Sequence, residues 1–360
     1  MKIVLVAGAR PNFMKIAPII DAIQEAQKKG KEITYQLVHT GQHYDKKLSE
    51  QFFDELRIPK PDTNLNVGSG SHATQTAAIM VAFETYLIEN PCDLVMVVGD
   101  VNSTLAASLV AKKLHIKAAH VEAGIRSFDI RMPEEINRLA TDAICDYFFT
   151  TTEWAGENLK KAGIQEEQIF FVGNTMIDTL TKNKERFKKP TCFDQLNLQD
   201  TAYIASTLHR PSNVDNKENL KVIIDELAKP GLPVVLPCHP RTRPKIEQLG
   251  DELPTNIHLV DPLGYLEFMY LINHSLAVVT DSGGIQEETT VLNVPCFTLR
   301  ENTERPETIE IGTNELLGID YSKISPAIEK VKNGEKKKGA IPELWDGNTS
   351  KRIIEALLLL

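Results

Sequence analysis

The sequence has few cysteines, and their spacing excludes two common kinds of site. The five cysteines lie far apart and include no C-x-x-C pair; they are Cys92, Cys145, Cys192, Cys238 and Cys296. Their odd number and wide spacing predict neither a zinc site nor a disulfide framework. We therefore expect no bound metal.

Long apolar runs and an excess of positive charge are also missing. No run approaches the roughly 20 residues of a membrane-spanning helix. The run at residues 3–7 is shorter than the apolar core of a signal peptide, so it predicts a first strand. The formal net charge is −9, whereas nucleic acids and anionic membranes attract basic surfaces. We expect a cytoplasmic protein without a nucleic-acid or membrane partner.

The common glycine-rich nucleotide fingerprints are absent. The first predicted strand is followed by Gly8 and Ala9, where a dinucleotide-binding G-x-G-x-x-G would need further glycines. The P-loop pattern G-x-x-x-x-G-K-[ST] occurs nowhere in the chain. The sequence therefore predicts neither a nicotinamide cofactor nor a P-loop triphosphatase.

The chain does contain two series of alternating strand and helix patterns. Its 360 residues favour two domains of roughly 100–200 residues each. Short apolar runs predict strands at residues 3–7, 33–39, 94–99, 117–121 and 147–151, and again at 202–207, 234–237, 257–260, 276–280 and 296–299. Amphipathic stretches such as 73–88 and 103–114 separate them, and this alternation builds parallel sheets covered by helices. The predicted fold class is α/β, with two Rossmann-like three-layer domains.

The charged, proline-terminated stretch 183–190 is the predicted domain boundary, although it could also be a surface loop inside one domain. It divides the chain into a first domain at 1–182 and a second at 183–349. The last helix, at 350–360, ends in four leucines that we expect to be buried. We therefore expect this helix to pack back on the first domain.

Candidate site residues follow the predicted strands, because ligands of open parallel sheets bind beyond the carboxyl ends of the strands. Arg10 and Lys15 open the first helix, where they could hold a phosphate or merely be solvated charges.

Three acidic positions follow in the same half: Asp100, Glu122 and Glu134. Each has a structural alternative, which is a helix cap for Asp100, a salt bridge with Arg126 for Glu122, and the helix dipole for Glu134. Taken together they suit the removal of a weakly acidic C–H proton and the return of a proton to the opposite face. That chemistry needs at least two positioned acid/base groups.

The second half repeats this arrangement with histidines and glycines. His209 and His239 follow its first two strands, each beside an arginine, which suggests a stabilised diphosphate leaving group. Residues 281–288 end a strand and open a helix with two glycines, so that backbone N–H groups could bind phosphate and Glu288 could accept from ribose hydroxyls. The alternative is a glycine-rich turn needed for packing alone.

At these residues the chain resembles the non-hydrolysing UDP-N-acetylglucosamine 2-epimerases. That family has the two-domain architecture called GT-B, with the active-site cleft between the domains. The resemblance runs essentially from end to end and rests on residues 8–11, 40–43, 99–100, 120–124, 133–138, 281–288 and 303–307.

The resemblance implies inversion at C2 of UDP-GlcNAc to give UDP-ManNAc, through elimination of UDP to a bound 2-acetamidoglucal and re-addition. Asp100, Glu122 and Glu134 match the catalytic carboxylates of the family, and His209 matches its histidine near the leaving group. No cofactor is implied. The family context implies cell-envelope polysaccharide biosynthesis and a homodimer.

The resemblance also implies binding roles. Arg10 and Lys15 would contact phosphates, and Ser282 and Gly283 the diphosphate. The other matching positions are Glu288 for the ribose, Phe268 for the uracil, Arg305 for the nucleotide end of the cleft, and Gln42, His43, Arg210 and His239 for a second, regulatory UDP-sugar.

One segment departs from the family pattern. Residues 125–132, in a loop that the resemblance places beside the sugar, are fewer than in the best-known bacterial members. A relative that acts on UDP-2,3-diacetamido-glucuronic acid has a similarly short segment, so that sugar is the alternative substrate. Alternatives of another class are a GT-B glycosyltransferase, which needs no carboxylate trio, and a non-catalytic UDP-sugar sensor, which could discard these acids.

Overall fold

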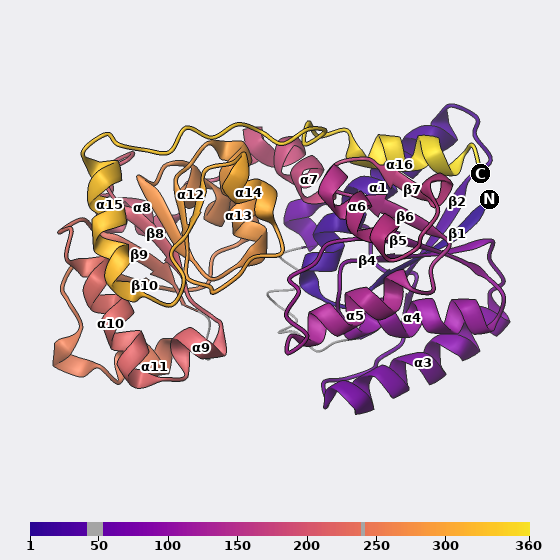
Figure 1. Ribbon diagram of the computed structural model, residues 1–360, viewed down its shortest axis with the longest axis horizontal. Helices are drawn as coiled ribbons and strands as arrows, with labels where there is room; N and C mark the ends of the chain where they lie inside the picture. Colours follow the sequence, from indigo (N-terminus) through magenta and orange to yellow (C-terminus); the bar gives the residue numbers. More distant parts are fainter. Residues whose placement is uncertain (42–52, 239–241) are drawn as a thin grey trace. The chain divides into compact units, whose positions relative to one another are not determined.

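The computed structural model of the chain describes residues 1–41, 53–238 and 242–360. These residues form two compact units, Met1–Lys182 with Glu343–Leu360, and Asn183–Pro342 (Figure 1). Each unit contains one parallel sheet with helices on both faces. The predicted fold class, with two parallel-sheet α/β domains, is confirmed.

The sheet of unit 1 has seven parallel strands among the described residues. Their order is β3 (Thr63–Asn64), β2 (Thr34–His39), β1 (Lys2–Ala7), β4 (Leu94–Val98), β5 (Lys117–Val121), β6 (Tyr147–Thr150) and β7 (Ile169–Phe171). The central strands are apolar throughout because helices cover both of their faces. In β1, for example, Leu5 pairs with Leu37 of β2 and Met96 of β4. The strand order reverses between β1 and β4, which is where open α/β sheets bind ligands.

Helices cover the two faces of this sheet. On one face, valines of β1 and β4 pack with Phe83 of α3 (His72–Glu89) and Val110 of α4 (Asn102–Lys113). On the other face lie α1 (Arg10–Lys28) and α16 (Thr349–Leu357) (Figure 1). Further helices of this part of the chain are α5 (Pro133–Asp142), α6 (Glu153–Lys161), α7 (Thr175–Asn183) and the 3-10 helix η1 (Glu166–Gln168).

The chain returns to unit 1 at Glu343, ahead of its last helix. Asp178 of α7 accepts hydrogen bonds from the backbone N–H groups of Thr349 and Ser350 at 3.0 and 2.7 Å, which anchors the start of α16. Of the four terminal leucines only Leu357 is buried, and residues 358–360 are exposed. The expectation that all four are buried is wrong, because α16 ends at Leu357, whose companions on the buried face are Ile353 and Ile354, and residues 358–360 follow the helix.

Unit 2 has a six-stranded parallel sheet among the described residues. Its order is β10 (Ile257–Val260), β9 (Val234–Pro237), β8 (Ile204–Thr207), β11 (Ala277–Thr280), β12 (Cys296–Thr298) and β13 (Asn314–Leu316). The order reverses between β8 and β11. This arrangement repeats the reversal between β1 and β4.

The helices of unit 2 also form two layers (Figure 1). On one face, a cluster of buried apolar side chains packs the sheet against α10 (Lys217–Ala228), α11 (Arg243–Glu247) and α15 (Ile324–Lys332). The other face carries α12 (Tyr265–Asn273) and α13 (Gly283–Leu292). Shorter elements are η2 (Lys184–Arg186), α8 (Thr191–Gln195), α9 (Pro211–Val214), η3 (Gly250–Glu252), α14 (Pro306–Glu310) and η4 (Tyr321–Lys323).

Each strand predicted from an apolar run is present, with bounds that differ by at most two residues. Three further strands, β3, β7 and β13, were not predicted, and all three lie at sheet edges. Within the described residues, no helix combines the length and the apolarity that a membrane span requires.

Candidate functional site

In unit 1 the predicted site residues gather where β1, β4 and β5 end. Glu122 directly follows β5 and is buried, with 4% of its surface exposed. Lys15 of α1 donates to Glu122 Oε2 at 2.5 Å. Glu122 Oε1 is buried without a hydrogen-bond partner among the described residues. One oxygen of this carboxylate is therefore held, while the other is available for chemistry.

The alternative of a salt bridge between Glu122 and Arg126 is wrong. Arg126 instead pairs with Asp142 at the end of α5, with its Nη1 atom 2.6 Å from Asp142 Oδ2. Glu122 has a backbone φ of +67°, a conformation that costs a residue with a Cβ roughly 1 kcal/mol or more. Such strain is typical of residues whose side chain must point in a defined direction.

The loops after β1 and β4 are tied together around this carboxylate. Asn12 accepts from the backbone N–H of Ala9 at 2.8 Å and donates to the carbonyl of Val98 at 3.1 Å. Gly99 has a φ of +67°, and a Cβ at this position would lie 3.0 Å from Lys15 Nζ and 4.0 Å from Glu122 Oε2. The positive φ favours a glycine here, and a Cβ would also press on the ammonium group of Lys15.

Asp100 is held by α5. Arg138 donates to Asp100 Oδ2 from Nε at 3.0 Å and from Nη2 at 2.6 Å. The same guanidinium contacts Glu135 Oε2 at 2.7 Å, and Glu135 in turn accepts from the backbone N–H of Ser127 at 2.9 Å. Asp100 thus takes part in an ion-pair network, and the N-cap residue of α4 is its neighbour Val101.

Glu134 is the second residue of α5 and is half-buried. It makes no hydrogen bond or ion pair with any residue that the structure describes, in contrast to its neighbour Glu135. Of the two acids at this helix start, Glu135 supports the loop through its contact with Ser127, and Glu134 is partly exposed to solvent.

Sequence reasoning missed Asp142, which organises the loops on both sides of β5. It is buried and contacts His120 Nδ1 at 2.7 Å, and it accepts from the backbone N–H of Gly124 at 3.1 Å. Burial alone would raise the pKa of Asp142, but His120 and Arg126 outweigh this effect and the pKa is lowered. His120 Nε2 lies 2.8 Å from the carbonyl of Gly99, so this network reaches the loop that carries Asp100.

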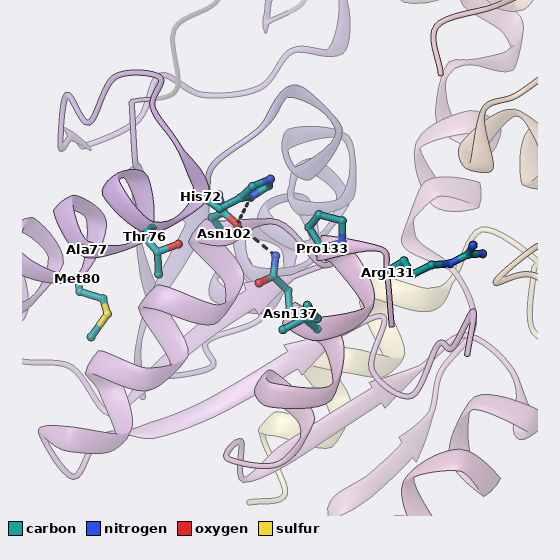
Figure 2. Close-up of a pocket in the computed structure, with 10 residues that line it drawn as sticks. His72, Thr76, Ala77, Met80, Asn102, Arg131, Pro133 and Asn137 are labelled. Atoms are coloured by element: carbon teal, nitrogen blue, oxygen red, sulfur yellow. Dashed lines mark hydrogen bonds between the residues drawn. The ribbon is translucent and has the colours of Figure 1, made fainter. Parts of the chain in front are cut away.

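A pocket of about 500 Å³ lies beside this network, between the N-terminal parts of α3, α4 and α5. Figure 2 shows Asn102 at its centre, bonded through Oδ1 to His72 Nδ1 at 3.2 Å and to Asn137 Nδ2 at 3.4 Å. Asn137 also donates to the carbonyl of Asp100 at 2.9 Å. The residues that line this pocket do not include any of the four predicted catalytic residues, which are Asp100, Glu122, Glu134 and His209.

In unit 2 the predicted residues gather where β8 and β11 end. His209 Nδ1 lies 2.7 Å from Asp281 Oδ1. Asp281 is fully buried and directly follows β11. Burial alone would raise the pKa of Asp281, but the imidazole of His209 and nearby backbone N–H groups outweigh burial and lower it.

The start of α13 is a candidate anion site. Ser282 is its N-cap residue, and the backbone N–H groups of its first turn have no partner within the helix. A Cβ on Gly283 would lie 2.8 Å from Arg305 Nη1, so the glycine lets this arginine approach the helix start. Arg305 itself donates to Glu287 at 2.6 Å and to Glu304 at 2.7 Å.

Glu288 lies in the second turn of α13 and is buried. Burial raises its pKa to about 8 against the opposing effect of the nearby Tyr265 hydroxyl. Tyr265 and the half-buried Phe268 lie one turn apart on α12, so they share one side of that helix. Helix α12, which carries Phe268, and helix α13, which carries Glu288, therefore lie next to each other within unit 2.

Some predicted residues are described only in part. Gln42, His43 and His239 lie outside the described residues, as does the side chain of Arg10, whose backbone begins α1. Arg210 donates its backbone N–H to Asp281 Oδ2 at 2.9 Å. Within the described part of the chain, no group of three or more histidine, cysteine, aspartate or glutamate residues is placed to hold a metal ion.

Comparison with known proteins gives consistent matches over the whole chain. A sequence model of the family described as UDP-N-acetylglucosamine 2-epimerase matches residues 25–358. A UDP-N-acetylglucosamine 2-epimerase of Methanocaldococcus jannaschii is 42% identical over 368 residues, with 99% of each chain covered. A UDP-2,3-diacetamido-2,3-dideoxy-D-glucuronate 2-epimerase of Pseudomonas aeruginosa is 43% identical over 323 residues, with 88% of each chain covered.

A solved structure agrees with these matches. The crystal structure of the Methanocaldococcus jannaschii UDP-GlcNAc 2-epimerase in complex with UDP-GlcNAc and UDP superimposes with a TM-score of 0.88. The identity is 40%, and all of both chains is covered.

Proposed function

Since the chain belongs to the UDP-N-acetylglucosamine 2-epimerase family, we propose that it converts UDP-GlcNAc into UDP-ManNAc by inverting the sugar at C2. UDP is eliminated together with the C2 proton, and it is then added back while a proton is delivered to the opposite face. The observation that carries this proposal is the buried carboxylate of Glu122, which has one oxygen bound by Lys15 and the other without a partner among the described residues.

The carboxylates of unit 1 exchange protons with the sugar. Abstraction of a C2 proton needs a base that is fixed in place, and Lys15 fixes Glu122 by its contact with Oε2. Asp100, held by Arg138, and Glu134, at the start of α5, supply the further acid/base groups. The resemblance assigned Lys15 to a phosphate, but its contact with Glu122 supports a role in holding that carboxylate.

Unit 2 binds the nucleotide. The N–H groups at the start of α13, next to Ser282 and Gly283, hold the diphosphate, and Glu288 contacts the ribose. Phe268 packs on the uracil, and His209 stabilises the leaving diphosphate. Arg305 lies against Gly283, so it supports the same helix start.

A second candidate substrate is UDP-2,3-diacetamido-glucuronate. It is favoured by the relative that is 43% identical and acts on this sugar, and by the short loop 125–132. A uronate would need a cation, and this loop carries Arg131, whose side chain is exposed and forms an ion pair with Asp129.

The test is to incubate the protein with each nucleotide sugar in deuterated water and to follow deuterium at C2 by NMR. The proposal predicts epimer carrying deuterium at C2, and the faster substrate identifies the sugar. Glu122→Gln should lower exchange by about 100-fold or more while UDP binding is retained. The matched control Glu153→Gln changes an exposed glutamate of the same unit and should exchange normally. Product that keeps all of its original C2 hydrogen would contradict the proposal.

We also propose that the protein is a homodimer. Large apolar side chains are exposed on α3 and α5, namely Val81, Ile88, Ile136 and Leu139, which we call the α3–α5 surface. Exposed apolar groups on neighbouring helices favour a protein partner. A second copy can use the same surface in a two-fold contact.

A further inference from the structure

The contact between His209 and Asp281 carries an inference that rests on the proposed function and adds a residue to it. We propose that Asp281 is the positioning residue of His209: it holds the imidazole in the Nδ1–H tautomer and turns Nε2 toward the leaving diphosphate.

The geometry determines which nitrogen carries the proton. Asp281 Oδ1 lies 2.7 Å from His209 Nδ1, and an ionised carboxylate can only accept a hydrogen bond. Nδ1 must therefore donate. The carboxylate is fully buried, whereas 53% of the His209 side chain is exposed. The opposite edge of the ring, with Nε2, makes no hydrogen bond to any described residue.

Asp281 is itself held in place on its other oxygen. Oδ2 accepts from the backbone N–H groups of His209 and Arg210 at 3.0 and 2.9 Å, and from Asn213 Nδ2 at 3.0 Å. Asn213 is in turn fixed by the hydroxyl of Tyr321, which donates to Asn213 Oδ1 at 2.9 Å. Burial would raise the pKa of Asp281, but the His209 imidazole and the backbone N–H groups of Arg210 and His209 outweigh burial and lower it. The carboxylate is therefore held in its ionised form.

This arrangement suits the elimination step. A carboxylate of unit 1 takes the C2 proton, the C–H electron pair forms the C1–C2 double bond, and the C1–O bond breaks with its electron pair on the β-phosphate oxygen. Protonated His209 donates its Nε2 proton to that oxygen, and Asp281 stabilises the imidazolium before this transfer. In the return step the phosphate oxygen forms its bond to C1, and the electron pair of the double bond takes a proton from a carboxylic acid of unit 1 onto the opposite face of C2. The proton on the phosphate oxygen goes back to Nε2, so no atom is gained or lost.

Replacing Asp281 by asparagine separates this role from simple support of the loop. The side-chain oxygen of asparagine should occupy the position of Oδ2, because three donors converge there. The amide NH₂ then takes the place of Oδ1 and donates to Nδ1, so the ring must switch to the Nε2–H tautomer. The backbone contacts survive this substitution, whereas the tautomer does not.

The experiment measures the tautomer and turnover separately. Protein carrying ¹⁵N-labelled histidine is studied by NMR, with His209→Gln used to assign the signal. We expect the Nδ1–H tautomer in the unsubstituted protein and the Nε2–H tautomer in Asp281→Asn. Turnover of Asp281→Asn should fall by about 10²–10⁴-fold with UDP binding retained, as expected for a histidine held in the wrong tautomer.

Tyr321→Phe is the matched control. It removes the hydroxyl that donates to Asn213 but leaves the donors to Asp281 Oδ2 and the contact between Oδ1 and Nδ1. We expect it to keep the Nδ1–H tautomer and most of the turnover. The proposal is overturned if Asp281→Asn keeps the Nδ1–H tautomer or full turnover, or if Tyr321→Phe loses as much turnover. The NMR measurement needs no substrate, so it stands apart from the C2 exchange test of the proposed function.

Discussion

Lys15 and Glu122 are a buried ion pair, with 9% and 3% of their side chains exposed. Removing one partner of such a pair leaves an uncompensated buried charge, which typically costs about 3–5 kcal/mol. We therefore predict that Lys15→Met destabilises unit 1 by about that amount, and that adding Glu122→Gln to it recovers much of the loss. Urea unfolding followed by the fluorescence of Trp154 and Trp345, which both belong to unit 1, measures the change.

A matched control for this prediction is Lys182→Met. Lys182 pairs with Asp21 in the same unit, but their side chains are 43% and 40% exposed. Solvent screens such a pair, so the expected loss is at most about 1 kcal/mol. Equal unfolding midpoints for Lys15→Met and Lys182→Met would show that burial of the Glu122 charge does not determine the loss of stability.

Glu288 should make the stability of unit 2 depend on pH. Its pKa in the folded protein is about 8, whereas the ordinary value is 4.5. Between these values the unfolded chain releases the proton and the folded protein retains it, so stability falls as the pH rises from 4.5 to 8 and levels off above. The change is on the order of a few kcal/mol. Glu288→Gln cannot ionise, so its Tm should fall less over this range.

The comparison uses the difference in Tm between the unsubstituted protein and each variant at several pH values. Other buried acids such as Glu307, whose pKa burial raises to about 7, contribute equally to both proteins and cancel in that difference. The exposed Glu218 of α10 serves as the control, since Glu218→Gln should leave the pH dependence unchanged. A Glu288→Gln curve parallel to that of the unsubstituted protein would contradict the prediction.

At the scale of elements, strands were predictable where burial on both faces makes them apolar. The runs that form β1, β4, β8 and β11 lie in the middle of their sheets, so nearly every side chain is buried. The edge strands β3 and β13 have only two and three residues, with exposed or half-buried positions. Such strands form because a neighbouring strand offers hydrogen bonds, and an apolar pattern in the sequence cannot reveal this.

The candidate site was predictable in its positions and less so in its contacts. The rule that ligands bind beyond the carboxyl ends of strands located Asp100, Glu122 and His209 from sequence alone. The partners that hold them lie far along the chain: Glu122 contacts Lys15, which is 107 residues away, and Asp281 lies 72 residues from His209. Asp142 could not be singled out from the sequence, because a polar residue at a helix end is common. Only the fold shows that it contacts His120.

At the scale of the whole molecule, both units place their candidate residues by the same rule. In unit 1 the strand order reverses between β1 and β4, and Lys15 and Asp100 follow these strands. In unit 2 it reverses between β8 and β11, which are followed by His209 and Asp281. Because each sheet carries its candidate residues at its own reversal point, the polar motifs recur along the sequence after corresponding strands.

The α3–α5 surface leads to a prediction about assembly. A stable two-fold contact buries an apolar centre of the same residues from both copies, and a charge placed there loses its hydration without gaining a partner. Val81→Glu combined with Ile136→Glu should therefore give a monomer by light scattering at concentrations where the unsubstituted protein is a dimer. Val222→Glu, at an exposed apolar position of α10 in unit 2, is the control and should stay dimeric. If the unsubstituted protein is a monomer, or if the control dissociates equally, this surface is not the contact between copies.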